Sequence, residues 1–212
     1  MLEESFLLEA RWYRPERSRR TLAAKRGVFC FKREDMNKYK IFVPEVEDIE
    51  GIIEMHVQSW LDVYPNKVHG ISRKHVQESV KRFTNDDGHR KRRQYVDEAH
   101  TNPDYFFRIA KDEDNKVVGF IDVRRGDKEN ELGGLYVDKT AYGTGLAKEL
   151  TGQAMSWLDD DSKDIRLTVT TYNDRAQAFY RKLGFELVTG SERLKDSTGI
   201  PIVEMIRKGE AK

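Results

Sequence analysis

The stretch ELGGLYVDKTAYGTGLA, residues 131–147, contains a strand-like run at 131–138 and a short glycine-rich turn at 141–147. An amphipathic helix follows the turn, and NDRAQAFYRKLGF, residues 173–185, comes further along the chain. A strand that leads into a glycine-rich turn at a helix N-terminus presents free backbone N–H groups, and the helix dipole there favours negative charge. The segment therefore predicts an anion-binding turn, with Tyr180 on a later helix that can return beside it.

The hydrophobic pattern on either side of this segment predicts a regular order of helices and strands. Strands are expected at 39–43, 105–110, 117–123, 131–137, 165–170, 185–188 and 200–206, and helices at 49–61, 72–83, 146–158 and 176–183. Ser72 is expected to cap the second helix, and Gly184 stands where a C-terminal glycine belongs. Residues 85–88 are expected to form a turn, and the basic run at 89–94 is interpreted as a solvated helix face. The order predicts one mixed α/β domain.

This order, together with the two quoted segments, resembles the GCN5-related N-acetyltransferase (GNAT) superfamily. The resemblance spans about residues 39–208 and is most specific from 117 to 185. It implies an α/β (α+β) fold with a mixed, mostly antiparallel sheet, splayed between its fourth and fifth strands and flanked by helices. It also implies transfer of an acetyl group from acetyl-CoA to a primary amine of a small molecule or protein, by direct attack in a ternary complex.

The resemblance also implies which residues bind the cofactor. They are Leu135, Tyr136, Val137, Tyr142, Gly143, Thr144, Gly145, Leu146, Ala147 and Asn173. The two glycines of the turn have a second interpretation, a tight turn that needs glycine for its backbone alone. Asn173 can equally be a helix N-cap. Family members usually carry Gln or Arg three residues before the first turn glycine, where this chain has Thr140, with Lys139 as a nearby charge.

Four further residues concern the strand and the chemistry. Gly133 and Gly134 lie inside a strand, which predicts a bulge beside a close ligand, or alternatively a locally weak strand. The resemblance makes Tyr180 the acid that protonates the CoA thiolate, although an aromatic at its helical spacing also fits a core residue. Glu131 matches the position of a carboxylate that deprotonates the amine, directly or through water, and an ordinary strand-edge charge is the alternative.

Composition and charge exclude several classes of protein. The 212 residues include Lys+Arg 38 and Asp+Glu 37, so no overall field attracts nucleic acid or a membrane surface. One cysteine, Cys30, excludes a disulfide framework, and the five histidines show no metal spacing, so no metal cofactor is expected. We see no signal peptide and no apolar run of membrane-spanning length, and therefore expect a cytoplasmic enzyme. A homodimer is left open.

The N-terminal segment and the expected acceptor pocket lie outside the two motifs. Residues 1–38 are interpreted as an N-terminal extension, loose or not translated if synthesis begins at Met36, ahead of a domain at 39–208. The acceptor pocket is expected from residues 51–100 and 189–199, with His56 and Trp60 interpreted as packing residues. Two other functions remain open: a non-catalytic acyl-CoA-binding sensor, and a protein-interaction module that uses the arginine-rich segments.

Overall fold

The computed structural model describes residues 38–158, 163–195 and 198–209, so the expected extension at 1–38 lies almost wholly outside the described residues. The described residues belong to one compact unit. No helix in these three ranges is long and apolar enough to cross a lipid bilayer.

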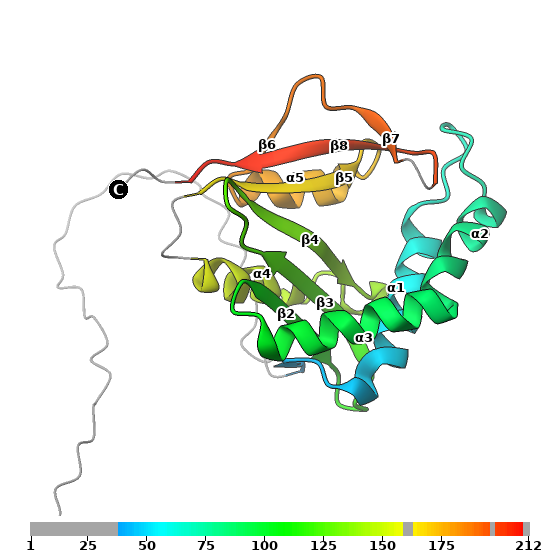
Figure 1. Cartoon of the computed structure of the whole chain (residues 1–212). Coiled ribbons are helices and arrows are strands. Elements are labelled where there is room, and N and C mark those ends of the chain that lie inside the picture. The colour runs from blue at the N-terminus through cyan, green and yellow to red at the C-terminus, as the bar shows by residue number, and fades with distance from the viewer. Residues whose placement is uncertain (1–37, 159–162, 196–197, 210–212) are drawn as a thin grey trace, which may run out of the picture. The chain divides into compact units, whose positions relative to one another are not determined.

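One mixed sheet organises the domain (Figure 1). Its strands are β1 (Lys40–Phe42), β2 (Tyr105–Lys111), β3 (Val117–Arg124), β4 (Asn130–Val137), β5 (Ile165–Thr170), β6 (Glu186–Leu187), β7 (Arg193–Lys195) and β8 (Ile200–Arg207). The order across the sheet is β1-β2-β3-β4-β5-β8-β6, with β7 also paired to β8. Every pair is antiparallel except β4 with β5. This arrangement is the predicted fold class.

The parallel pair is the place where the sheet opens. Strands β4 and β5 pair only at Asn130 with Ile165 and Glu131 with Arg166, at their first residues. Beyond these residues the strands diverge, which Figure 1 shows as a wedge between β4 and β5. The edge of β4 from Leu132 onward therefore has no strand partner on the β5 side. The sheet is splayed between its fourth and fifth strands, as predicted.

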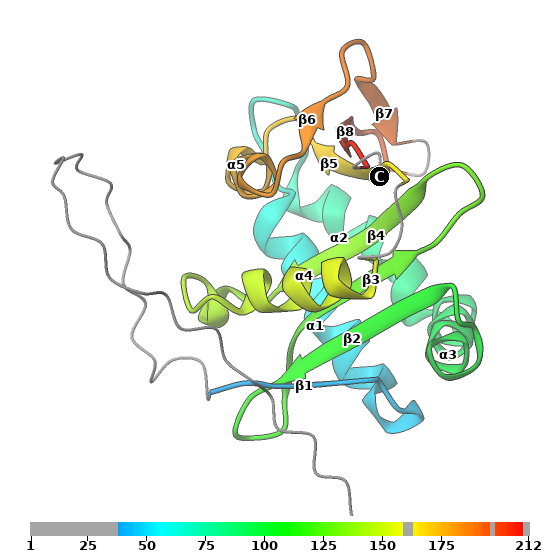
Figure 2. The same cartoon turned by 90° about the vertical axis from the view of Figure 1, so that its left-hand side faces the viewer.

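Helices cover both faces of β2, β3 and β4. They are α1 (Ile49–Val63), α2 (Arg73–Thr84), α3 (Asp86–Thr101), α4 (Leu146–Trp157) and α5 (Asp174–Lys182), with 3-10 turns η2 (Val46–Asp48) and η3 (Lys139–Ala141). Helices α1 and α3 pack on one face and α4 on the other, which Figure 2 shows for α3 and α4. The alternation of β3 explains this, because Ile121 and Val123 face the α4 core whereas Phe120 packs with α1 and α3.

The structure confirms most predicted elements and corrects two of them. Residues 85–88 are not a separate turn, because Asn85 accepts a hydrogen bond from the Gly88 N–H (2.8 Å) and so caps α3, which begins at Asp86. Such a cap favours a helix start even though glycine lies in the first turn. The polar stretch after residue 188 also contains β7, which the alternating pattern did not predict.

Candidate functional site

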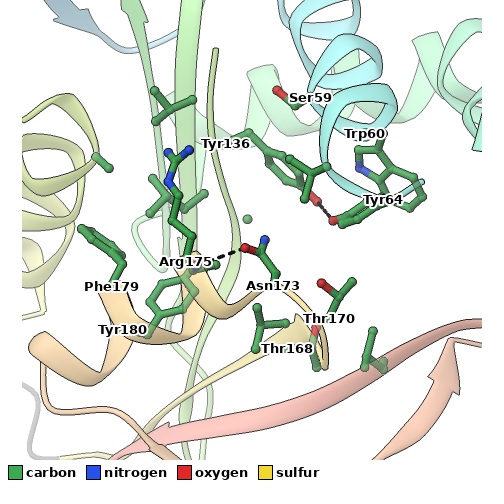
Figure 3. Close-up of a pocket in the computed structure, with 18 of the residues that line it drawn as sticks. Ser59, Trp60, Tyr64, Tyr136, Thr168, Thr170, Asn173, Arg175, Phe179 and Tyr180 are labelled. Atoms are coloured by element: carbon green, nitrogen blue, oxygen red, sulfur yellow. Dashed lines mark hydrogen bonds between the residues drawn. The ribbon is translucent and has the colours of Figure 1, made fainter. Parts of the chain in front are cut away.

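The wedge between β4 and β5 leads into a pocket that we call the cleft pocket (Figure 3). Its walls are β4, β5, the start of α5 and the end of α1. It is lined by Ser59, Trp60, Val63, Tyr64, Leu132, Gly133, Gly134, Leu135, Tyr136, Val137, Tyr142, Ala147, Thr168, Val169, Thr170, Asn173, Arg175, Ala176, Phe179, Tyr180, Lys195, Ile200 and Ile202. Six of the ten residues expected to bind the cofactor are in this lining; Gly143, Thr144, Gly145 and Leu146 are not.

Those four residues form the turn before α4 and the first residue of that helix. Gly143 and Gly145 have φ of 79° and 92°, so the backbone itself requires glycine there. Leu146 is only 1% exposed and packs in the core. The contact expected between Leu146 and the cofactor is through the backbone, and it stays a prediction. Among the described residues, the N–H groups of Gly143, Gly145 and Ala147 have no hydrogen-bond partner, so the turn still offers free donors at the start of α4.

Thr140, where relatives usually have Gln or Arg, has a local structural role. Its N–H and its hydroxyl both donate to Asp138 Oδ1, at 2.9 and 2.7 Å, and so close η3. These bonds lower the pKa of Asp138 against the opposing effect of burial. Lys139 forms an ion pair with Asp62 of α1 (3.4 Å). The two residues tie the turn to the neighbouring elements.

The glycines of β4 form a bulge, as predicted, but the structure supplies a reason different from a ligand. Asp122 lies opposite Gly134 and Val123 lies opposite Leu132, so Gly133 is the extra residue. A Cβ on Gly133 would lie 2.2 Å from Asp122 Oδ2, and one on Gly134 would lie 3.0 Å from Asp122 Oδ1. The Asp122 carboxyl thus occupies the space above both glycines. Its side chain, and not a ligand alone, excludes larger residues.

Helix α5 brings two predicted residues to the cleft pocket. Asn173 accepts a hydrogen bond from the Ala176 N–H (3.1 Å), so it is an N-cap that also lines the pocket. Tyr180 is 7% exposed and packs against Phe179 and Phe185 while lining the pocket. Burial, followed by the nearby Tyr136 and Asp122, raises the pKa of Tyr180, so its hydroxyl keeps its proton at neutral pH.

A second pocket, which we call the charged pocket, lies next to the cleft pocket and encloses about 470 Å³. It is lined by His56, Trp60, Arg82, Phe83, Asp87, Gly88, Lys91, Arg92, Tyr95, Phe120, Asp122, Arg124, Glu131, Gly133, Gly134, Tyr136 and Lys195. Five of these residues, Trp60, Gly133, Gly134, Tyr136 and Lys195, also line the cleft pocket. The two pockets therefore meet at the bulge of β4.

Two carboxylates of the charged pocket lie close to this bulge. Glu131 is exposed at the start of β4 and lines the charged pocket. Asp122 is half-buried, and burial raises its pKa to about 7 despite the opposing effects of Arg92 and Arg124, with Glu131 adding to the rise. A carboxyl with a pKa near neutrality is suited to exchange protons at pH 7. The sequence offered Glu131, but nothing in it singled out Asp122.

Aromatic rings form the other wall of the charged pocket. His56, on α1, stacks on Phe83 with ring centroids 4.3 Å apart and receives a hydrogen bond from Trp60 Nε1 (3.0 Å). Burial, then the charges of Arg92, Arg82 and Lys195, holds the pKa of His56 well below its usual range. His56 is thus a neutral, largely buried ring, as its interpretation as a packing residue requires. In the neighbouring cleft pocket, the Tyr64 hydroxyl lies 3.3 Å from the Tyr136 hydroxyl (Figure 3).

Several residues of the two pockets were missed in the sequence. Arg175 places its guanidinium 3.2 Å from the centre of the Tyr142 ring at the mouth of the cleft pocket. Arg92 was interpreted only as part of a solvated basic run, yet it is 8% exposed. The helical period of α3 would have shown that Arg92 and Val96 share its buried face.

Within the described ranges, no group of three or more His, Cys, Asp or Glu residues is arranged to hold a metal ion.

Comparison with known proteins identifies the family. The model of the acetyltransferase (GNAT) domain matches residues 71–208, which is more than half of the chain. This chain therefore belongs to the GNAT acetyltransferase family.

Curated relatives match over a shorter region. Uncharacterised N-acetyltransferases of Mycobacterium tuberculosis and Mycobacterium bovis are 36% identical over 76 residues, 35% of this chain. The chain spans about half the length of these relatives, 49%.

Solved structures share the fold at low sequence identity. The PaiA N-acetyltransferase of Thermoplasma acidophilum, crystallised with coenzyme A, superposes with a TM-score of 0.64 at 22% identity, over 80% of this chain and 98% of that one. A GNAT acetyltransferase of Staphylococcus aureus gives a TM-score of 0.57 at 19% identity, over 80% and 98% of the two chains.

Proposed function

We propose that this enzyme transfers an acetyl group from acetyl-CoA to a primary amine. The observation that carries the proposal is the wedge between β4 and β5, which leaves the edge of β4 unpaired beside free N–H groups at the start of α4. An unpaired strand edge can bond an extended amide chain as a further strand would. The pantetheine arm would lie along Leu135–Val137 and the pyrophosphate at Gly143–Ala147. A similar fold crystallised with coenzyme A supports this placement.

The chemistry would proceed by direct attack in a ternary complex. The amine would enter from the charged pocket and lose its proton to a carboxylate at the bulge, or to water held there. A backbone N–H near Val137 would polarise the thioester carbonyl, and Tyr180 would protonate the departing thiolate. The described residues contain no cysteine, so the residues that line the cleft pocket supply no thiol for an acyl-enzyme.

Two measurements test the donor and the transfer separately. Calorimetric titration with acetyl-CoA should show binding, and a free-thiol release assay across an amine panel should show turnover. Absence of binding would refute the whole proposal. Binding without turnover of any amine would instead indicate a non-catalytic acyl-CoA sensor.

The identity of the base is tested by the pH dependence of kcat/KM. If Asp122 must be ionised, kcat/KM rises as the pH passes about 7, the pKa of its carboxyl. Asp122→Asn should then abolish that limb, while Glu131→Gln shifts it to lower pH, because the Glu131 charge helps to raise the Asp122 pKa. Loss of the low-pH limb in Glu131→Gln alone would assign the role to Glu131. A limb intact in both variants would assign it to water.

A further inference from the structure

His56 lies between two groups that can only donate hydrogen bonds. Trp60 Nε1 lies 3.0 Å from His56 Nε2, and an Arg92 guanidinium nitrogen lies 3.3 Å from His56 Nδ1. Indole and guanidinium N–H groups are never acceptors, and a neutral imidazole accepts at only one of its two nitrogens. Since the ring accepts from Trp60, Nδ1 carries its hydrogen toward Arg92. Both groups at this contact are donors, so neither can accept a hydrogen bond from the other. A third group within reach of both could accept from the two of them.

Arg92 itself is a buried cation without an acceptor. It is 8% exposed and lines the charged pocket. Across the described part of the chain, it forms no ion pair and donates to no oxygen; its neighbours are the rings of Tyr95, Phe107 and Phe120, at 5.8, 5.9 and 5.2 Å. Burial lowers the pKa of Arg92, and the charge of Asp122, which lies beyond ion-pair distance, acts in the opposite direction. Because Arg92 lines the charged pocket and no protein oxygen of the described ranges accepts from it, an anion bound there would satisfy its donors.

Lys195 adds a second cation at the junction of the two pockets. Its ammonium group lies 5.4 Å from the Trp60 ring centre and has no ion-pair partner among the described residues. Burial, then the charge of Arg82, lowers its pKa. Two other cations of the charged pocket differ, because Arg124 pairs with Glu98 (2.6 Å) and Lys91 pairs with Asp87 (3.0 Å). Arg92 and Lys195, the two cations described above, therefore both lie close enough to His56 for their charges to act on it.

We infer that the amine acceptor also carries an anionic oxygen group, a carboxylate or a phosphate, bound by Arg92, Lys195 and the Nδ1–H of His56. This inference rests on the proposed acetyl transfer and specifies its substrate class. The acceptor amine lies toward Asp122 and Glu131 at the bulge, and the anion lies toward the cations beyond it. A volume of about 470 Å³ fits a small zwitterionic amine. Polycationic amines are poor substrates, because the site would place cation against cation.

The first experiment compares acceptors that differ only in the anion. The free-thiol assay is run with amino acids of aliphatic, aromatic and acidic type, each beside its carboxamide, and with phosphoethanolamine beside ethanolamine. We expect kcat/KM to be at least about ten-fold higher for the anionic member of one or more pairs, since sites built around a polar group reject analogues that lack it. The carboxylate and phosphate arms identify the source of the anion. Equal rates within every pair that is turned over would overturn the inference.

Variants locate the effect in the charged pocket. Lys195→Met keeps the length of the side chain and removes its charge, and we expect it to lower the ratio of kcat/KM for the anionic acceptor to kcat/KM for its neutral partner about ten-fold. Arg92→Gln should act in the same direction. Lys91→Met is the matched control, because Lys91 lines the same pocket but is paired with Asp87 and exposed. An equal loss for Lys91→Met would contradict the assignment.

A binding measurement tests the proposed anion site independently of turnover. N-acetylated amino acids and their amides are titrated into the full chain by calorimetry, while the ring signals of His56 are followed by NMR. The anionic compound should bind more tightly, shift the His56 signals and lose this advantage in Lys195→Met. If no amine is acetylated but this pattern holds, the anion site stands and the transfer proposal fails. If acid and amide bind alike, the anion site is refuted whatever the activity.

Discussion

The cleft pocket and the charged pocket share Gly133, Gly134 and Tyr136 of β4, but they are encoded differently in the chain. The cleft pocket takes much of its lining from two short segments, residues 132–147 and 168–180. The charged pocket is assembled from positions scattered between 56 and 136, together with Lys195. A pocket made by contiguous motifs and backbone geometry can be recognised in a sequence. One made by tertiary contacts between distant side chains cannot.

The largest expected effect concerns the chemistry of the cleft pocket. Tyr180→Phe removes one hydroxyl and should lower kcat about a hundred- to ten-thousand-fold while acetyl-CoA affinity is kept, because a positioned acid acts mainly in the transition state. Thiol-release kinetics and calorimetry measure the two quantities. Since its raised pKa keeps the hydroxyl protonated, Tyr180 should cause no loss of activity as the pH rises from 6 to 9.

The control for Tyr180 is another phenol outside the pocket lining. The Tyr172 hydroxyl donates to the Tyr64 carbonyl oxygen (2.8 Å), and Tyr172→Phe should leave kcat within about two-fold. Unchanged turnover in Tyr180→Phe would remove the tyrosine from the mechanism and leave it as a core residue.

The sequence predicted the elements that carry strong local signals. Ser72, Asn173 and Gly184 have their expected capping roles, and the β4–β5 splay agrees with the resemblance. The failures have tertiary causes. The start of α3 depends on the Asn85 cap overcoming an Asp-Asp-Gly sequence that is typical of turns. The role of Asp122 depends on a neighbour strand whose bulge leaves room for its carboxyl, and no local pattern in residues 117–124 contains that information.

The second prediction tests the shared bulge, where the two pockets meet. Gly133→Ala would place a Cβ 2.2 Å from Asp122 Oδ2, and should lower the free energy of unfolding by about 1–3 kcal/mol, as overpacking does. Urea unfolding measures the change. In a double-mutant cycle with Asp122→Ala, the cost of the added methyl group should largely disappear.

A glycine without close neighbours provides the control for the bulge. A Cβ on Gly152 of α4 meets nothing within 4 Å, so Gly152→Ala should stabilise the protein by about 0.5–1 kcal/mol. A full cost of Gly133→Ala in the Asp122→Ala background would show that the strand backbone, and not the carboxyl, requires glycine.

The third prediction concerns the charge of Arg175 at the mouth of the cleft pocket. The guanidinium of Arg175 lies on the Tyr142 ring, which belongs to the expected phosphate turn. Arg175→Gln should weaken acetyl-CoA binding about five-fold, and the loss should shrink at high salt because the interaction is electrostatic. Arg181, on the same helix but hydrogen-bonded to Gln177, is the control, and Arg181→Gln should change affinity less than two-fold. Equal losses would indicate a general charge effect.

The smallest effect separates the two roles of Asn173, whose side chain both caps α5 and lines the cleft pocket. Asn173→Ala should cost about 1 kcal/mol in the free energy of unfolding, whereas Asn173→Ser keeps a capping oxygen and should cost only a few tenths of that. If the cap is the whole role, acetyl-CoA affinity follows stability and Asn173→Ser binds normally. Weakened binding in a Ser variant of full stability would show that the amide contacts the ligand. A contiguous motif would then supply both the fold of the cleft pocket and its contacts, a combination that the charged pocket lacks.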